Sequence, residues 1–257
     1  MLILKFGGSS IGSVQAIGNF VNILNDNKHA GRVQAVVVSA LSGTTDSLIA
    51  LAWQAAGGDG AYRDGTEALR RRHLEISSFF LKDSLRSGAN SQIGELFDEL
   101  IRILDGLAVL RELSPRVLDT VMGFGERFSA SLLAPVVTAS GLPAEFLDTR
   151  TLIMTDDHYG NARFFPEESF ARIRAHFEAK KGEKPALPIA TGFIASTAGG
   201  NTTTLGRGGS DLTAAIFGAA LDAEEVEIWT DVDGILTADP RMVKNAFRIE
   251  SISYVEA

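Results

Sequence analysis

Short apolar runs alternate with helical patterns in the first part of the chain. The apolar run Leu2–Phe6 ends at two glycines, which predicts a buried strand. Residues 11–26 then carry an apolar side chain at every third or fourth position, which indicates an amphipathic helix. The β-branched run 33–40 predicts a second buried strand, and residues 42–56 predict a helix after it. This order is typical of a parallel sheet covered on both faces.

Residues 61 to about 114 interrupt this alternation. They are rich in charge and poor in strand patterns, and the segments 63–81 and 93–110 have the spacing of helices. We therefore expect a helical insertion that packs on the main body of the protein.

Strand and helix patterns alternate again after this insertion. Helices are predicted at 125–141, 167–181 and 211–223, and strands at 143–148, 187–196 and 224–231. Near the last residue, Ser253 and Glu256 have the spacing of a helix-capping box, but no helix follows them. A capping box without a helix is an unusual natural end, so we expect the chain to be a piece of a longer protein.

Composition limits the classes of function. The chain has 257 residues, 45% of them hydrophobic, which allows one large domain or two small ones. The net charge of −8 argues against nucleic acid as a partner, so an anionic ligand must be held by a few local cations and amides. Cysteine is absent, which excludes disulfides and thiolate metal sites. Without a signal sequence or an apolar run of about 18 residues, a cytoplasmic protein with no membrane contact is predicted.

A glycine-rich turn precedes the predicted helix 211–223. The stretch "GRGGSD" places Arg207, Gly208, Gly209 and Ser210 directly before Asp211, where helical apolar spacing begins. A helix N-terminus carries unpaired N–H groups and a partial positive charge, which suits an anion, and arginine can bind a carboxylate through two hydrogen bonds. An ordinary loop before a capped helix would also explain this stretch.

A second glycine turn follows the first strand. In "KFGGSS", Lys5 stands at the end of the strand, directly before Gly7, Gly8 and Ser9. Ligands of open α/β sheets bind outside the carboxyl ends of the strands, so a lysine here suits a phosphoryl group. A lysine whose stem packs along the sheet is the structural alternative. Neither glycine stretch fits GxxxxGK[ST] or GxGxxG, so the common nucleotide motifs are absent.

The stretch 229–241, "WTDVDGILTADPR", is the third candidate. Thr230 and Asp231 end a predicted strand, and Asp239, Pro240 and Arg241 form a rigid turn that presents a cation. Hydroxyl and acidic groups suit ribose or metal-bound phosphate, and Arg241 suits phosphate. A hydrogen-bonded surface loop would produce the same pattern.

Taken together, these elements resemble the aspartate kinases of the amino-acid kinase superfamily. The resemblance rests on "KFGGSS", "TTTLGRGGSD" and "WTDVDG…TADPR", on "VVVSA" followed by Thr45, and on "GFGERFSA" around Glu126. The wording "TDVDG" is most similar to the kinase half of bifunctional aspartokinase–homoserine dehydrogenases. The resemblance implies an α/β fold, a three-layer α/β/α sandwich with a mostly parallel central sheet.

The resemblance also implies an activity. It implies transfer of the γ-phosphoryl group of ATP, with Mg²⁺, to the side-chain carboxylate of L-aspartate, the first step of lysine, threonine and methionine biosynthesis. It further implies that the intact protein is a homo-oligomer through regions after residue 257. A lysine-bearing "FGAKV" segment that contacts ATP is also expected there, so residues 1–257 are expected to be a C-terminally truncated catalytic domain.

Site residues follow from the same resemblance. Lys5 and Asp211 are the expected catalytic residues, with Asp211 orienting Lys5, although Asp211 could also be an ordinary helix-terminus acid. The residues expected at the nucleotide are Lys5, Phe6, Gly7, Gly8, Ser9, Thr230, Asp231, Leu236 and Arg241. Leu236 departs from the family, which often has an aromatic residue there. The residues expected at aspartate are Ser39, Thr45, Glu126, Arg207, Gly208, Gly209 and Ser210.

Two other functions fit parts of this pattern. The first is a related kinase acting on glutamate, N-acetylglutamate, carbamate or UMP, but the pairing of Glu126 with Arg207 favours a free amino acid. The second is a non-catalytic binding module with the same fold, but the presence of Lys5, Arg207 and Asp211 argues against it. No protein metal site is predicted, and the four histidines lie outside the motifs and are interpreted as solvated or structural.

Overall fold

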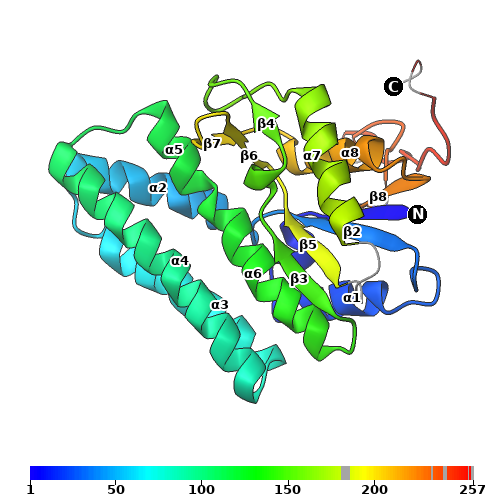
Figure 1. Cartoon of the computed structure of the whole chain (residues 1–257), viewed down its shortest axis with the longest axis horizontal. Helices are drawn as coiled ribbons and strands as arrows, with labels where there is room; N and C mark the ends of the chain where they lie inside the picture. The colour runs from blue at the N-terminus through cyan, green and yellow to red at the C-terminus, as the bar shows by residue number, and fades with distance from the viewer. Residues whose placement is uncertain (181–185, 233, 240–241, 254, 256–257) are drawn as a thin grey trace.

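A five-stranded parallel sheet forms the centre of the protein. Figure 1 shows the computed structural model of the chain, which describes residues 1–180, 186–232, 234–239, 242–253 and 255. The strand order is β3-β5-β2-β1-β8, and neighbouring strands pair in parallel. The strands are β1 (Leu2–Phe6), β2 (Val33–Val38), β3 (Ala144–Leu147), β5 (Leu187–Thr191) and β8 (Glu225–Trp229). The fold class predicted from the sequence is confirmed.

Helices cover both faces of this sheet. The helices α1 (Val14–Leu24) and α6 (Phe124–Ala139) pack on one face, and α7 (Pro166–Ala179) and α8 (Gly209–Ala220) pack on the other (Figure 1). Alternate residues of β1 divide between the two cores, because successive side chains of a strand point to opposite faces. Leu4 and Phe6 belong to the core under α1 and α6, whereas Ile3 belongs to the core under α8. Lys5, two residues after Ile3, therefore points to the α8 face.

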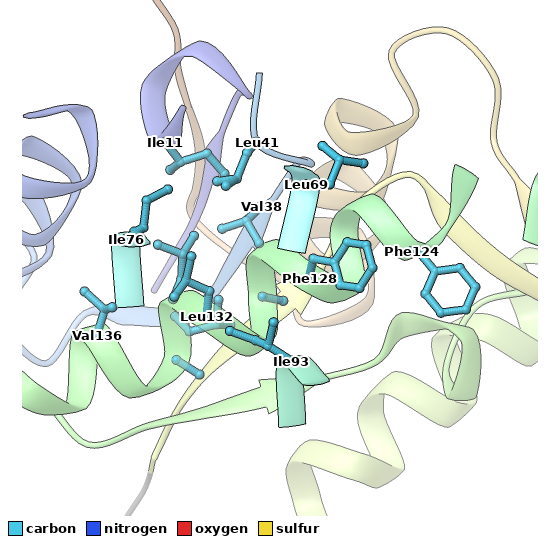
Figure 2. Packing of buried hydrophobic residues seen from close by; sticks show 14 of the residues in the cluster. Ile11, Val38, Leu41, Leu69, Ile76, Ile93, Phe124, Phe128, Leu132 and Val136 are labelled. Atoms are coloured by element: carbon cyan, nitrogen blue, oxygen red, sulfur yellow. The ribbon is translucent and has the colours of Figure 1, made fainter. Parts of the chain in front are cut away.

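A layer of helices packs on α6. It contains α3 (Tyr62–Phe80) and α4 (Asp83–Leu110), which fall within the predicted insertion of 61 to about 114, and the flanking helices α2 (Thr44–Gly57) and α5 (Pro115–Met122). Phe97 of α4 stacks on Phe128 of α6, with 4.0 Å between ring centroids. Figure 2 shows Leu69, Ile76 and Ile93 of this layer beside Phe128 and Leu132 of α6. Helix α4 begins about ten residues before the start predicted from its apolar pattern. The prediction missed its first turns because they expose most of their side chains and so lack apolar spacing.

One predicted strand is two strands in the structure. The run 187–196 is divided by Gly192 and Phe193 into β5 and β6 (Ile194–Thr197), and Phe193 has a φ of 64°. Strand β6 joins a small second sheet of order β4-β6-β7, with β4 at Met154–Thr155 and β7 at Thr202–Thr204. Gly192 permits the bend because a Cβ there would lie 2.5 Å from Ser210 Oγ. Apolar periodicity does not distinguish one long strand from two short ones.

The remaining elements are short or lie in part outside the described residues. Two 3₁₀ turns, at Ser9–Ile11 and Thr149–Thr151, were not predicted, and neither was α5. Of the predicted capping pair, Glu256 lies outside the described residues. Within the described part of the chain, every helix is too short or too polar to cross a membrane.

His73 of α3 is a structural histidine inside the helical layer. Its ring is 0% exposed, lies 5.7 Å from Phe97 and 5.3 Å from Phe128, and hydrogen-bonds through Nδ1 to the Leu69 carbonyl at 2.8 Å. Its Nε2 has no hydrogen-bond partner among the described residues. Burial, and to a lesser extent Arg72, lowers the pKa of His73 from 6.5 to about 4, because the charged ring would lose its hydration.

This buried ring predicts acid sensitivity. Below pH 6.5 the unfolded chain binds a proton at His73 that the folded protein does not bind until about pH 4. The contribution of His73 to stability is therefore complete above pH 6.5 and decreases by about 3 kcal/mol as the pH falls through this window. We expect His73→Phe, which keeps an aromatic ring at this position, to weaken the pH dependence of denaturant unfolding between pH 7 and pH 4.5. The same substitution at the exposed His158 should leave that dependence unchanged.

Candidate active site

A pocket of about 400 Å³ opens at the carboxyl ends of β1 and β2. Five separate parts of the sequence line it: the end of β1 with the first glycine turn, the loop after β2 with the start of α2, the start of α6, the bend between β5 and β6, and the segment that leads into α8. The lining residues are Lys5, Gly8, residues 39–43, Thr45, Asp46, Glu126, Phe193 and residues 206–211. Lys5 and Arg207, which the sequence predicts to share one cleft, line the same pocket.

Lys5 reaches the pocket from the α8 face of the sheet. Its ammonium lies 2.6 Å from the carboxylate of Asp211 in the first turn of α8, and its side chain is 10% exposed. The contact between Lys5 and Asp211 that the sequence predicts is therefore present. Because Asp211 is 46% exposed, water screens this pair, and its contribution is to the orientation of the ammonium more than to stability.

The first glycine turn is held between β8 and the loop after β2. The amide of Gly7 and the hydroxyl of Ser10 both donate to the Trp229 carbonyl, at 3.2 Å each. The amide of Ser42 donates to the Gly8 carbonyl at 3.2 Å. A Cβ on Gly8 would lie 2.8 Å from the Ala40 carbonyl oxygen, so only glycine allows the turn and the loop to approach this closely.

Two helices begin at this pocket without a capping side chain. The cap of α2 is Gly43, with a φ of 77°, and the cap of α8 is Gly208, with a φ of 73°. At neither helix start does a backbone N–H donate a capping hydrogen bond to a side chain of the described residues. Uncapped N-termini leave backbone N–H groups and positive dipole ends available, which is the arrangement that binds anions. The pocket therefore combines two anion-binding helix starts with the cation of Lys5.

Glu126 supplies a buried carboxyl group to the same pocket. It lies in the first turn of α6, is 3% exposed, and its Oε1 accepts a hydrogen bond from the Ala40 amide at 3.0 Å. Its Oε2 has no hydrogen-bond partner among the described residues. Burial raises the pKa of Glu126 to about 8, because a carboxylate there loses its hydration, and the Ala40 amide offsets only part of this effect. An ammonium group at the unpartnered Oε2 would stabilise the ionised carboxylate, so this position is suited to a cationic ligand.

Arg207 lies on the turn between β7 and α8. It is exposed, and no salt bridge to it is found in the described part of the chain. The start of this turn is fixed by the buried Asp119, which accepts hydrogen bonds from the amide and hydroxyl of Thr204 at 2.9 Å and 3.0 Å and from the Gly160 amide at 2.9 Å. Burial raises the pKa of Asp119, and these three hydrogen bonds lower it in part. Arg207 therefore follows the end of β7, which Asp119 holds in place.

Several predicted nucleotide residues do not line this pocket. Phe6 points to the α1 face, where its ring contacts Phe20 and Trp229, so only its backbone is available to a ligand. Thr230 and Asp231 are exposed directly after β8, next to the end of β1, and the Thr230 hydroxyl donates to Asp231 at 3.1 Å. The other members of this set are Gly7 and Ser9 of the first turn and Leu236, which bridges to Arg248. Arg241 lies outside the described residues.

Sequence reasoning missed other pocket residues. Asp46 follows Thr45 at the start of α2, and the helix-start pattern "SGTTD" is the signal that could have included it. Phe193 enters the pocket because of its left-handed backbone, and its ring packs where a Cβ on Gly209 would be, at 2.7 Å. No sequence signal marks Phe193. The described residues also contain no group of three or more histidines or carboxylates that could hold a metal ion.

Comparison with known proteins identifies the family. A sequence profile of the Amino acid kinase family matches residues 1–257. The chain belongs to the amino acid kinase family. Among other members, it is 37% identical over 256 residues to the bifunctional aspartokinase/homoserine dehydrogenase 2, chloroplastic, of Arabidopsis thaliana, which covers 98% of this chain and 27% of that protein. It is 34% identical over 262 residues to the lysine-sensitive aspartokinase 3 of Escherichia coli, over 100% of this chain and 55% of that protein.

Solved structures of aspartokinases are also similar to this chain. The crystal structure of E. coli aspartokinase III in complex with aspartate and ADP matches with a TM-score of 0.86 and 32% identity, over 97% of this chain and 53% of that chain. An isopentenyl phosphate kinase, at 15% identity and a TM-score of 0.54, shares the fold alone. The chain thus spans between a quarter and about half of the aspartokinases that it resembles.

Proposed function

We propose that this chain is an aspartate kinase, which transfers the γ-phosphoryl group of ATP to the side-chain carboxylate of L-aspartate. The observation that carries the proposal is the unpartnered Oε2 of the buried Glu126 in the same pocket as Arg207 and two uncapped helix starts. Such a pocket has one place for an ammonium group and several places for anions. The aspartate and ADP bound to E. coli aspartokinase III, at 32% identity, support the same substrates here.

The two ends of aspartate are recognised by opposite charges. Glu126 binds the α-ammonium through Oε2, and Arg207 binds the α-carboxylate through its guanidinium. The remaining donors are hydroxyls and amides at the starts of α2 and α8, namely Ser39, Thr45, Gly208, Gly209 and Ser210. This arrangement turns the side-chain carboxylate of aspartate toward Lys5.

The reaction needs charge neutralisation and alignment but no general base. The side-chain carboxylate has a reference pKa of about 3.9, so it is already ionised at neutral pH. One of its oxygens attacks the γ-phosphorus, the bond from that phosphorus to the bridging oxygen breaks, and ADP leaves with 4-phospho-L-aspartate as the other product. Lys5, oriented by Asp211 at 2.6 Å, neutralises the transferring group, and amides of the glycine turn help to hold it.

The nucleotide lies along the first glycine turn and the segment after β8. We assign to it the backbone of Phe6, the residues Gly7, Gly8 and Ser9, and the later residues Thr230, Asp231, Leu236 and Arg241. Mg²⁺ would enter with ATP as part of the MgATP substrate and would neutralise part of the phosphate charge.

The raised pKa of Glu126 predicts that aspartate binding releases a proton. With a pKa of about 8, Glu126 is largely protonated in the free protein at pH 7, whereas an ammonium at Oε2 stabilises the ionised form. Aspartate affinity should therefore rise with pH up to about pH 8, and binding at pH 7 should release about one proton. Calorimetry at pH 7 in buffers of different ionisation enthalpy measures this number. Glu126→Gln should bind aspartate more weakly and release none, and equal proton release from both proteins would contradict the assignment.

A hydroxylamine trap tests the proposed function directly. Acyl phosphates react with hydroxylamine to give hydroxamates, which are detected as coloured complexes with Fe³⁺, so only the true acceptor gives a signal in the presence of MgATP. We expect hydroxamate from L-aspartate and none from glutamate, N-acetylglutamate or carbamate. Hydroxamate from another acid would identify a different kinase of the family. No hydroxamate from any acid, combined with aspartate binding, would identify a binding module.

A further inference from the structure

Arg72 of α3 hydrogen-bonds to two loops of the candidate site. Its Nη1 donates to the Ser42 carbonyl and its Nη2 to the Gly12 carbonyl, both at 2.8 Å. Gly12 ends the 3₁₀ turn that follows the first glycine turn, and Ser42 lies in the loop after β2. One half-buried guanidinium thus joins both loops to the helical insertion.

These two loops lie close together. A Cβ on Gly12 would lie 2.9 Å from the Ser42 Cβ, and a Cβ on Gly8 would lie 2.8 Å from the Ala40 carbonyl oxygen. Two carbonyls that converge in this way repel each other unless a donor lies between them. The planar guanidinium holds several N–H groups in a fixed fork, so it can bind both carbonyls at once and fix their separation.

The separation of the two loops matters for the reaction. Gly8 reaches the pocket from the first loop, which follows Lys5 of β1, and Ser42 and Gly43 reach it from the second, which leads into α2. In the proposed function the first loop holds the nucleotide phosphates and the second holds aspartate. Misplacement of reacting groups by about 1 Å can reduce a rate by about 100-fold.

We propose that Arg72 is a positioning residue, which fixes the phosphate-binding turn against the aspartate-binding loop. This inference rests on the proposed function, and it gives the helical insertion a role in alignment. Arg72 is not needed to hold α3 in place, because Leu69, His73 and Ile76 of the same helix are buried in the core. Removing its guanidinium should therefore change the reaction without unfolding the helix.

Three variants test this role. Arg72→Ala removes the bridge, Arg72→Lys keeps the charge but not the fork, and Arg71→Ala is the matched control at the exposed neighbouring position. We expect kcat for hydroxamate formation to fall about 100-fold in Arg72→Ala and about 10-fold or more in Arg72→Lys. The dissociation constants of MgATP and aspartate, each measured alone, should change far less than kcat. Guanidinium added to Arg72→Ala should restore part of the rate. A kcat within about twofold of the Arg71→Ala value would overturn the inference.

Amide hydrogen exchange tests the bridge without any activity. In Arg72→Ala, peptides that contain residues 6–13 and 39–46 should exchange faster than in Arg71→Ala, because the Ser42 amide and the turn at Ser10 and Ile11 lose their support. Peptides of β5 and α8 should be unchanged in both variants. If the wild-type protein makes no hydroxamate, the proposed function fails while exchange still decides whether Arg72 holds the loops. Equal exchange of both loops in the two variants would reject the positioning role.

Discussion

Replacing Arg207 with alanine is expected to weaken L-aspartate binding by at least about 100-fold while leaving MgATP binding nearly unchanged. The guanidinium supplies two charge-assisted hydrogen bonds to the α-carboxylate, each contributing about 1.5–3 kcal/mol, and tenfold in affinity corresponds to about 1.4 kcal/mol. Arg207 is exposed on the turn before α8, so its truncation leaves no buried group without a partner. Titration calorimetry with each substrate separately measures both effects.

Two further variants make this result specific. Arg172 of α7 is exposed and does not line the pocket, so Arg172→Ala should bind aspartate like the wild-type protein. Arg207→Lys keeps a positive charge but makes fewer bonds to a carboxylate, so its affinity should be intermediate. Unchanged aspartate affinity in Arg207→Ala would show that another group binds the α-carboxylate.

The substitution Lys5→Met is expected to slow phosphoryl transfer by about 1000-fold with little loss of substrate binding. Methionine has a similar length, so the stem can pack as before, but the positive charge beside the transferring group is lost. Asp211 then remains as a carboxylate without its 2.6 Å partner, which its 46% exposure makes tolerable. Single-turnover transfer of radiolabelled phosphate from ATP to aspartate measures the chemical step.

A lysine outside the site is the control for this variant. Lys180 at the end of α7 pairs with Glu145 on the far edge of the sheet, so Lys180→Met should retain the wild-type rate. A Lys5→Met rate within about tenfold of the wild-type rate would assign the neutralisation of the transferring group to other residues.

The order along the chain of the strands in the central sheet and of the helices that cover it could be predicted because its signals are local. The apolar run of β1 and the helical spacing of α1 depend on neighbouring residues, and both elements are present close to their predicted bounds. The two glycine turns could also be located, because each is marked by two adjacent glycines that allow backbone conformations other residues disfavour. The bend at Phe193 could not be predicted, because it depends on the approach of Gly192 to Ser210.

The candidate site was only partly predictable for the same reason. Glycine, lysine and arginine at the ends of strands indicated that an anion binds, but they did not show that Glu126 is buried with one oxygen unpartnered. Burial of that carboxyl results from the packing of α6 against the loop after β2, 86 residues earlier in the chain. Arg72 gave no signal at all, since it is one of three consecutive arginines on a charged helix.

The sequence by itself determined the alternation of elements, the two glycine turns and the types of charged group available for the chemistry. These features follow from backbone freedom and apolar spacing within short segments. Only the tertiary structure decided that five distant segments meet in one pocket, that α8 presents Asp211 to Lys5, and that Arg72 joins two loops. Such contacts depend on how the layers pack, because a side chain's partner and its hydration are set by residues far away in the chain.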